Sequence, residues 1–275
     1  MVQRYEHHMN LKEDALCPFK YSVLKNQREC VCNWHRNLEI LMVEAGNCRV
    51  QCGRENAALS AHDLAVVNSE TIHRLYSETA VDYHCLIFDE GFCAENGIKP
   101  DEYRFESFFR DEKTEKLCLA VKTRMEEYRR EPTGLQAARL RIAVLAVLIN
   151  LCTEHAIPAS EAPPSADSSS GACVRKALEY INDHIAEEIT LDSLAAYCGV
   201  TKYHLARRAG HYMGQTLFTY INTLRCKKAE EYLMRGMSVT EAASACGFDS
   251  LSYFSRTYKK LMGYTLSGRT HKKES

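Results

Sequence analysis

The apolar residues near the start of the chain fall in short runs that have the length and spacing of β-strands. Between about Tyr21 and Phe88 these runs are LEILMVEAG, CRVQC, LAVVN and YHCLIF, with turn residues such as Gly46 and Gly53 between them. Strands usually contain about four to eight residues and are bounded by such turn residues. Several short strands at near-regular spacing are typical of a β-sandwich or a β-barrel.

The pattern changes to a helical period between residues 111 and 157. Leu117, Val121 and Met125 recur at four-residue intervals, and the later stretch LQAARLRIAVLAVLINLC predicts a second, strongly buried helix. Its apolar core, residues 142–151, is shorter than the stretch of about 18 residues that a membrane span requires, so we expect no membrane partner. We expect this helix either to pack on the barrel or to pair two chains in a homodimer.

A segment rich in proline, serine and alanine follows at residues 158–172, PASEAPPSADSSSGA. It has no means to bury apolar surface and therefore predicts a flexible linker. The remaining residues, 173–275, have a helical pattern throughout. The sequence thus predicts an α+β chain with a strand-built domain in 1–110, a helical dimerisation segment in 111–157, the linker and an all-α C-terminal domain.

Charge is distributed unevenly between these parts. The net charge is −1, but residues 173–275 carry 15 lysines and arginines against 10 acidic residues, a net +5. A basic domain favours an anionic partner. The 13 cysteines include no CxxC pair, and the N-terminus has charges where a signal peptide needs an apolar core, so we expect a cytoplasmic protein with free thiols.

One pattern occurs twice in the basic domain. CGVTKYHLARRAGHYMG occupies residues 198–214 and CGFDSLSYFSRTYKKLMG occupies residues 246–263. A shift of 49 positions places Arg207 on Arg256. Each copy reads as a helix, a tight turn and a second helix, and such a helix-turn-helix can place its second helix in the DNA major groove.

The residues around each copy predict where the first helices begin and end. Thr190 and Ser238 are the expected N-caps, because a hydroxyl can accept a hydrogen bond from the first turn of the helix. Gly199 and Gly247 are expected to end these helices with positive φ.

The segment between the copies, LFTYINTLRCKKAEEYLMR at residues 217–235, reads as one amphipathic helix with Phe218, Ile221, Leu224 and Leu233 facing inward. It spans about 28 Å at the usual helical rise. Recognition helices in successive major grooves lie about 34 Å apart, so this helix is a suitable rigid spacer.

The stretch SVTEAASACGFDSLSYFSRTYKKLMGYT resembles the signature of the AraC (arabinose-regulator) type of bacterial transcription factor, and the likeness extends over residues 174–270. The resemblance implies a seven-helix domain with both recognition helices in the major groove of double-stranded DNA, and it allows RNA polymerase as a further partner. The DNA-facing residues that it implies are Tyr203, Ala206 and Arg207 in the first recognition helix, Leu251, Ser252, Ser255 and Arg256 in the second, Lys202, Lys259 and Lys260 near phosphates, and Ser250 at the N-cap of the second helix.

The first copy departs from this family at Arg208-Ala209-Gly210, where the resemblance implies an apolar, an aromatic and a basic residue. Loss of a core aromatic costs about 3–5 kcal/mol when nothing replaces it. A glycine inside a helix costs about 1 kcal/mol more. Either neighbours such as Tyr212 fill the space and DNA binding persists, or the first motif is impaired.

The N-terminal domain carries a second likeness. Asn33, Trp34, His35, Glu39 and Gly46 follow the spacing HxH(x)3E(x)6G with asparagine in place of the first histidine, which resembles the first motif of cupin barrels. The segment DLAVVNSETIHRL, which contains His73, looks like the second motif.

Cupin enzymes bind a metal through three histidines and a glutamate, and asparagine is a poor ligand for most transition metals. We therefore expect His35, Glu39, His73 and Trp34 to bind a small-molecule effector, a sugar by family default, with neither metal nor cofactor. Two function classes remain open: a sensor barrel that controls DNA binding, and a metal-dependent enzyme fused to a DNA-binding tail.

Overall fold

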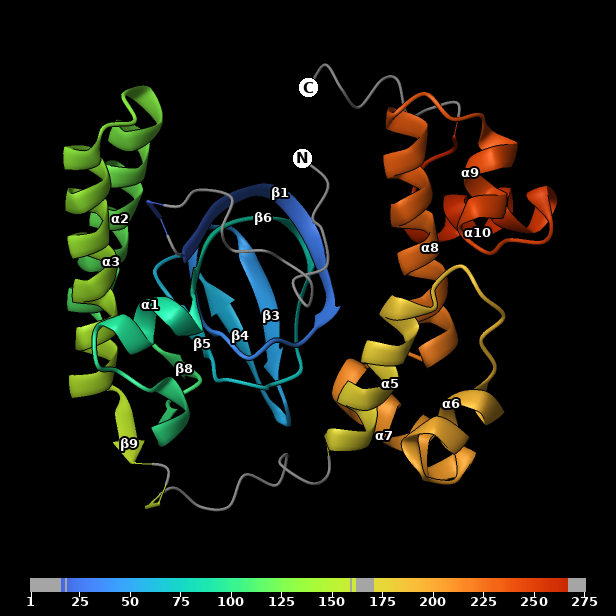
Figure 1. Ribbon diagram of the computed structural model, residues 1–275, viewed down its shortest axis with the longest axis horizontal. Helices are drawn as coiled ribbons and strands as arrows, with labels where there is room; N and C mark the ends of the chain where they lie inside the picture. Colours follow the sequence, from blue (N-terminus) through green and yellow to red (C-terminus); the bar gives the residue numbers. More distant parts are fainter. Residues whose placement is uncertain (1–15, 18, 159, 162–170, 267–275) are drawn as a thin grey trace. The chain divides into compact units, whose positions relative to one another are not determined.

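The computed structural model describes residues 16–17, 19–158, 160–161 and 171–266. The described residues form two compact units, one before residue 168 and one from residue 171 (Figure 1). The sequence patterns had placed the boundary in the linker 158–172, of which residues 159 and 162–170 lie outside the described part.

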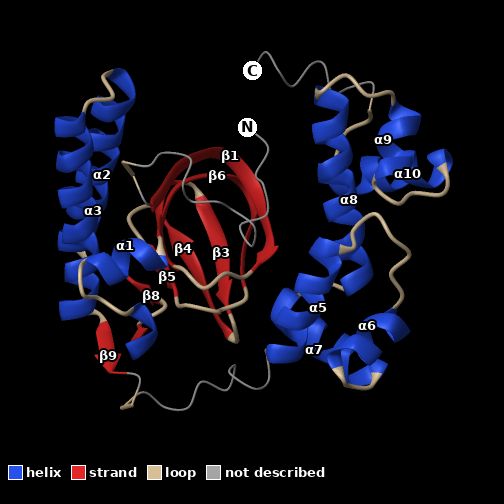
Figure 2. Cartoon of the chain, in the orientation of Figure 1, coloured by secondary structure: helices blue, strands red, loops and turns tan. Residues whose placement is uncertain are grey.

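The first unit is a nearly closed antiparallel barrel, as the strand pattern predicted (Figure 2). Among the described residues, the sheet order is β4-β3-β6-β2-β5-β8, and β1 pairs along β6. Its strands are β1 (Phe19–Asn33), β2 (Leu38–Ala45), β3 (Asn47–Cys52), β4 (Glu55–Ser60), β5 (Leu64–Val67), β6 (His73–Phe88) and β8 (Phe108–Phe109). A separate pair joins β7 (Tyr103–Phe105) to β9 (Ala156–Pro158).

Each central strand serves two cores, because successive side chains of a strand point to opposite faces. Along β2, Ile40 and Met42 belong to the core that the sheet shares with the helices, whereas Leu41 and Val43 belong to the core inside the barrel. Glu39 lies on the same face as Leu41. The pattern of β2 therefore puts a carboxylate inside the barrel.

The helices of this unit are the α-helices α1 (Glu90–Glu95), α2 (Glu112–Arg130) and α3 (Gly134–Glu154) and the short 3-10 helix η2 (Pro100–Glu102). Figure 1 shows α2 and α3 side by side against the barrel. Asp111 caps α2, and Thr133 caps α3. Of the described helices, α3 alone has the length and apolar composition of a membrane span, which by itself is weak evidence for one. Val144 and Val147 on it are completely buried in the core shared with the sheet.

The second unit is entirely helical in its described part. It contains α5 (Ala172–Asp183), α6 (Leu191–Cys198), α7 (Lys202–Met213), α8 (Leu217–Met234), α9 (Val239–Ala245) and α10 (Leu251–Met262). These are six helices within residues 171–266, where the resemblance implied seven for the whole domain. Thr190 and Ser238 cap α6 and α9 as predicted. Gly199 and Gly247 have φ of 69° and 78°, also as predicted.

One predicted contact in α8 is wrong. Phe218 is 62% exposed, whereas Leu217, Tyr220, Ile221 and Leu224 are buried. Residues at i, i+3, i+4 and i+7 share one helix face, so the buried stripe starts at Leu217 and leaves Phe218 outside it.

Candidate functional site

The first helix-turn-helix consists of α6, its glycine turn and α7. Tyr203 is 81% exposed, and Lys202, Ala206 and Arg207 are exposed as well. Thr201 caps α7 by accepting a hydrogen bond from the backbone of His204. The four predicted DNA-facing side chains therefore leave the helix on its solvent side, away from buried residues such as Leu205.

Lys202 also interacts within the motif. Its Nζ lies 3.1 Å from Oδ1 of Asp192, which is in the first turn of α6. Both side chains are largely exposed, so this pair contributes little stability, and the lysine can exchange the carboxylate for a phosphate.

The second motif has the same arrangement on α10. Its predicted DNA-facing residues, which are all exposed, are Ser250, Leu251, Ser252, Ser255, Arg256, Lys259 and Lys260. Phe254 and Tyr258, on the opposite face, are completely buried. Ser250 caps the helix by accepting from the backbone nitrogen of Tyr253 at 3.3 Å. Nε of Arg256 donates to the carbonyl of Ser252 at 3.3 Å, which holds the guanidinium along the exposed face.

The atypical run in α7 does not interrupt the helix. Ala209 is completely buried and Tyr212 is 1% exposed, so an aromatic ring fills this core from a position three residues further along. Arg208 donates from Nε to Nε2 of His204 at 2.6 Å, and Gly210 faces solvent. The packing supports the alternative in which the first motif keeps its shape, while its DNA affinity stays a prediction.

The sequence patterns missed a residue that fixes the second motif. The guanidinium of Arg225 on α8 donates to the carbonyls of Ile185 at 2.9 Å, Gly247 at 2.7 Å and Glu187 at 2.6 Å. These acceptors lie in the segment after α5 and in the turn before α10. The only signal in the sequence was an arginine in the middle of an amphipathic helix, which does not identify its acceptors.

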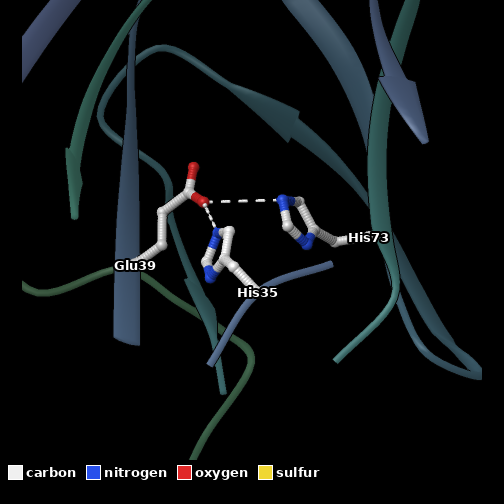
Figure 3. Close-up of side chains that lie close together, drawn as sticks. All are labelled: His35, Glu39 and His73. Carbon is white, nitrogen blue, oxygen red and sulfur yellow. Dashed lines mark hydrogen bonds and ion pairs between the residues drawn. The ribbon is translucent and has the colours of Figure 1, made fainter. Parts of the chain in front are cut away.

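The barrel holds a buried polar cluster of three predicted site residues, His35, Glu39 and His73 (Figure 3). Oε2 of Glu39 lies 2.8 Å from Nε2 of His35 and 3.4 Å from Nε2 of His73. Each of the three side chains is at most 4% exposed. Sγ of Cys85 donates to Oε1 of Glu39 at 3.0 Å.

Burial alone would raise the pKa of Glu39, but the hydrogen bond from His35 and the positive charges that His73 and His35 can carry outweigh it. Together they lower the pKa of Glu39 below its ordinary value. The carboxylate is therefore ionised at neutral pH, and it requires a positive partner inside an otherwise apolar barrel.

The other two predicted residues of this region are buried as well. Trp34 is 8% exposed, which fits a core residue better than an exposed stacking platform. Asn33, which replaces the first histidine of the cupin motif, is 7% exposed and pairs with His73 across β1 and β6. The structure thus places the motif positions of the two strands next to each other.

Comparison with known proteins gives the same two-part division. Residues 26–144 match the AraC-like ligand binding domain and residues 194–268 match a helix-turn-helix domain. The HTH-type transcriptional regulator YbfI of Bacillus subtilis is 24% identical over 232 residues, which cover 80% of each chain. The MmsAB operon regulatory protein of Pseudomonas aeruginosa is 32% identical over 89 residues, 32% of this chain and 29% of that protein.

Among solved structures, ToxT from Vibrio cholerae O395 bound to (E)-4-(8-methylnaphthalen-1-yl)but-3-enoic acid covers 91% of this chain and 97% of its own, with a TM-score of 0.51 and 13% identity. This likeness shows a common fold. The match to the AraC-like ligand binding domain, the match to the helix-turn-helix domain and the likeness to a transcriptional regulator along 80% of the chain show that the chain belongs to the AraC family of transcriptional regulators.

Proposed function

We propose that α7 and α10 read the base sequence of an operator, and that a small molecule bound in the barrel of residues 1–110 controls this binding. The observation that carries the DNA-binding part is the exposure of every predicted base-facing side chain on α7 and α10, while the opposite face of each helix is buried. Helices packed in this way leave one face free to enter a major groove.

The proposed roles of two residues on α10 can be separated. Arginine can bind O6 and N7 of guanine with two hydrogen bonds, whereas a lysine on a phosphate carries no sequence information. With a duplex selected by the full-length protein from a random pool, Arg256→Ala should weaken binding by about 1–3 kcal/mol and relax one base position. Lys259→Ala should weaken selected and scrambled duplexes by the same factor and reduce the salt dependence.

Fluorescence anisotropy at several salt concentrations measures both effects. Identical behaviour of the two variants would contradict the assignment of base reading to Arg256.

The effector site is proposed to be the barrel interior around His35, Glu39 and His73. These groups offer hydrogen bonds and charge within apolar walls, as ligand sites usually do. A sugar is the family-level expectation, and the carboxylic acid bound to ToxT makes organic acids the second class to screen. A regulatory effector must bind two states of the protein with different affinity, so a hit in a thermal-shift screen must also change operator affinity.

We also propose a homodimer formed through α3 in the segment 111–157. Leu135, Ile142 and Ile149 are 63%, 69% and 48% exposed, and they recur every seven residues along one face. Seven-residue apolar spacing is the pattern that pairs helices. In size-exclusion chromatography coupled to light scattering, Ile142→Glu should lower the molar mass from that of a dimer to that of a monomer, whereas substitution of the exposed Arg139 by glutamate should leave it unchanged. A wild-type protein that is monomeric at micromolar concentration would exclude this interface.

A further inference from the structure

We propose that Cys173 and Cys198 are a site of reversible disulfide formation in the helical unit, with a low-molecular-weight disulfide such as oxidised glutathione as the oxidant. The bond joins the first turn of α5 to the last residue of α6, directly before the turn that leads to α7. Bond formation goes beyond the proposed function, whereas its effect on operator binding rests on that function.

Solvent access distinguishes these two thiols from the other cysteines. Of the cysteines whose burial the structure describes, only Cys152, Cys173 and Cys198 are partly exposed. Oxidation by a small molecule in solution requires such access. Cys152 lies on α3 in the other compact unit, so Cys173 and Cys198 are the one pair in which both described thiols can be reached within the same unit.

The two cysteines are also close together, although they are 25 positions apart in the chain. Sγ of Cys198 donates to the carbonyl oxygen of Cys173 at 3.3 Å. A carbonyl oxygen lies about 2.4 Å from its own Cα, so Sγ of Cys198 is within about 5.7 Å of the Cα of Cys173. Disulfides join residues whose Cα atoms are about 4.4–6.8 Å apart, so side-chain rotation and a small backbone shift are sufficient to form the bond.

The second motif contains a similar pair of cysteines in a buried form. Cys246 precedes its turn glycine as Cys198 precedes Gly199. Burial raises the pKa of Cys226 on α8, and the nearby Cys246 adds to this effect. Both of these thiols are completely buried. The chain therefore supplies its own control, a neighbouring pair of thiols that an oxidant does not reach in the folded protein.

The environment of Cys198 determines the order of the two chemical steps. Burial, to which the neighbouring Cys173 adds, raises the pKa of Cys198 to about 11, and the charge of Lys176 offsets part of this effect. These two groups, both on α5, are the titratable groups that face the thiol. Cys198 is therefore protonated at neutral pH and reacts second.

In the first step the thiolate of Cys173 attacks the small disulfide and releases one thiol. In the second step Cys198 attacks Sγ of Cys173 and releases the other thiol. The two protein sulfurs lose two electrons in total. The small disulfide takes up these electrons together with the two thiol protons, so no further reactant is needed.

Bond formation also moves the start of the first recognition helix. Sγ of Cys198 has to leave the carbonyl of Cys173, and Gly199, which follows with a φ of 69°, moves with it. The next helix, α7, begins at Lys202. The oxidised protein should therefore bind the operator more weakly than the reduced protein. Its helical unit should melt at a higher temperature, because a closed loop of about 25 residues restricts the unfolded chain.

The test starts from reduced full-length protein, which is incubated with oxidised glutathione, blocked with iodoacetamide in urea and digested without reduction. Mass spectrometry should find Cys173 linked to Cys198, while Cys226 and Cys246 remain thiols. Dithiothreitol should break the bond and restore operator affinity. The rate of the second step should rise about tenfold per pH unit around neutral pH, because the thiolate fraction of Cys198 rises by that factor well below its pKa.

Two variants separate the two steps. Cys198→Ser should stop the reaction at a stable glutathione adduct on Cys173, whereas Cys173→Ser should form no bond within the chain. The matched control is Cys152→Ser, which removes the third partly exposed thiol and should leave bond formation unchanged. Circular dichroism of each reduced variant verifies folding. If Cys198→Ser does not fold, the wild type and Cys173→Ser decide.

A wild-type protein in which Cys152 carries glutathione while Cys173 and Cys198 stay unlinked would overturn the proposal. A bond between Cys226 and Cys246 in the folded protein, or a second step whose rate does not depend on pH, would overturn it as well. Equal operator affinities of the oxidised and reduced forms would overturn its regulatory part. Absence of operator binding in the reduced wild type would instead contradict the proposed function.

Discussion

Replacement of Arg225 by methionine removes three hydrogen bonds that join separate parts of the DNA-binding unit. Its guanidinium contacts the carbonyls of Ile185 and Glu187, after α5, and of Gly247, in the turn before α10. Methionine retains a flexible apolar side chain, so the substitution removes the donors while it preserves much of the packing.

The expected loss follows from the burial of these bonds. The bonds to Ile185 and Gly247 are partly buried and the bond to Glu187 is exposed. At about 1.5 kcal/mol for each partly buried bond, the lower end for a charged donor, and little for the exposed one, Arg225→Met should lower the free energy of unfolding by about 3 kcal/mol. A domain of this size loses about 4–8 °C per kcal/mol, so the helical unit should melt about 12–24 °C earlier.

Thermal unfolding of the full chain, followed by far-ultraviolet circular dichroism, measures this loss. Arg235→Met is the control, because Arg235 is exposed at the C-terminal end of the same helix and should change the stability by less than about 0.5 kcal/mol. If Arg225→Met loses no more stability than Arg235→Met, the three hydrogen bonds do not hold the second motif in place.

Three further substitutions give distinct outcomes. Gly210→Ala should raise the free energy of unfolding measured by urea denaturation by about 1 kcal/mol, because Gly210 lies within α7 and an added Cβ meets no atom within 4 Å. An unchanged free energy of unfolding would mean that α7 is frayed at this position. Gly247→Ala should instead destabilise by more than about 1 kcal/mol, since φ is +78° and the added Cβ would lie 2.8 Å from the carbonyl oxygen of Ala186; a neutral result would show that this turn relaxes freely. Asp111→Ala should cost about 1 kcal/mol at neutral pH through loss of the α2 cap, whereas Asp111→Asn should retain most of it. Hydrogen bonds, of which the one from the Thr114 side chain has the largest effect, lower the pKa of Asp111 to about 2 in the folded protein. The stability advantage of Asp111 over alanine is therefore complete above the pKa that the carboxyl has in the unfolded chain, and it is lost as the pH falls towards about 2. A stability difference between wild type and Asp111→Ala that did not change with pH in denaturation curves would contradict this role.

The helix-turn-helix motifs could be predicted almost to the residue because their signals are local. A hydroxyl at Ser238 and a glycine at Gly247 determine where α9 begins and where its turn reverses, and both act within a few residues of themselves. The four apolar runs likewise lie in β2, β3, β5 and β6, although β6 begins at His73, ten residues before its run.

The remaining features depend on contacts between distant segments. Strand β1 carries the polar stretch KNQRE and has no clear alternation, so its pairing with β6 could not be read from its own residues. Glu39 and the two histidines could be proposed as one site from motif spacing. The direction of each imidazole depends on the carbonyls of Asn37 and Thr71, which no spacing rule specifies.

The double role of β2 has an evolutionary consequence. Its odd-numbered positions, such as Glu39 and Leu41, line the barrel interior, whereas even-numbered positions such as Ile40 and Met42 pack towards the helices. With the proposed effector site inside the barrel, substitutions at the odd-numbered positions would change which effector is bound, while the even-numbered positions that support α2 and α3 stay the same. On the proposed function, relatives that share this scaffold would therefore be able to bind chemically different effectors.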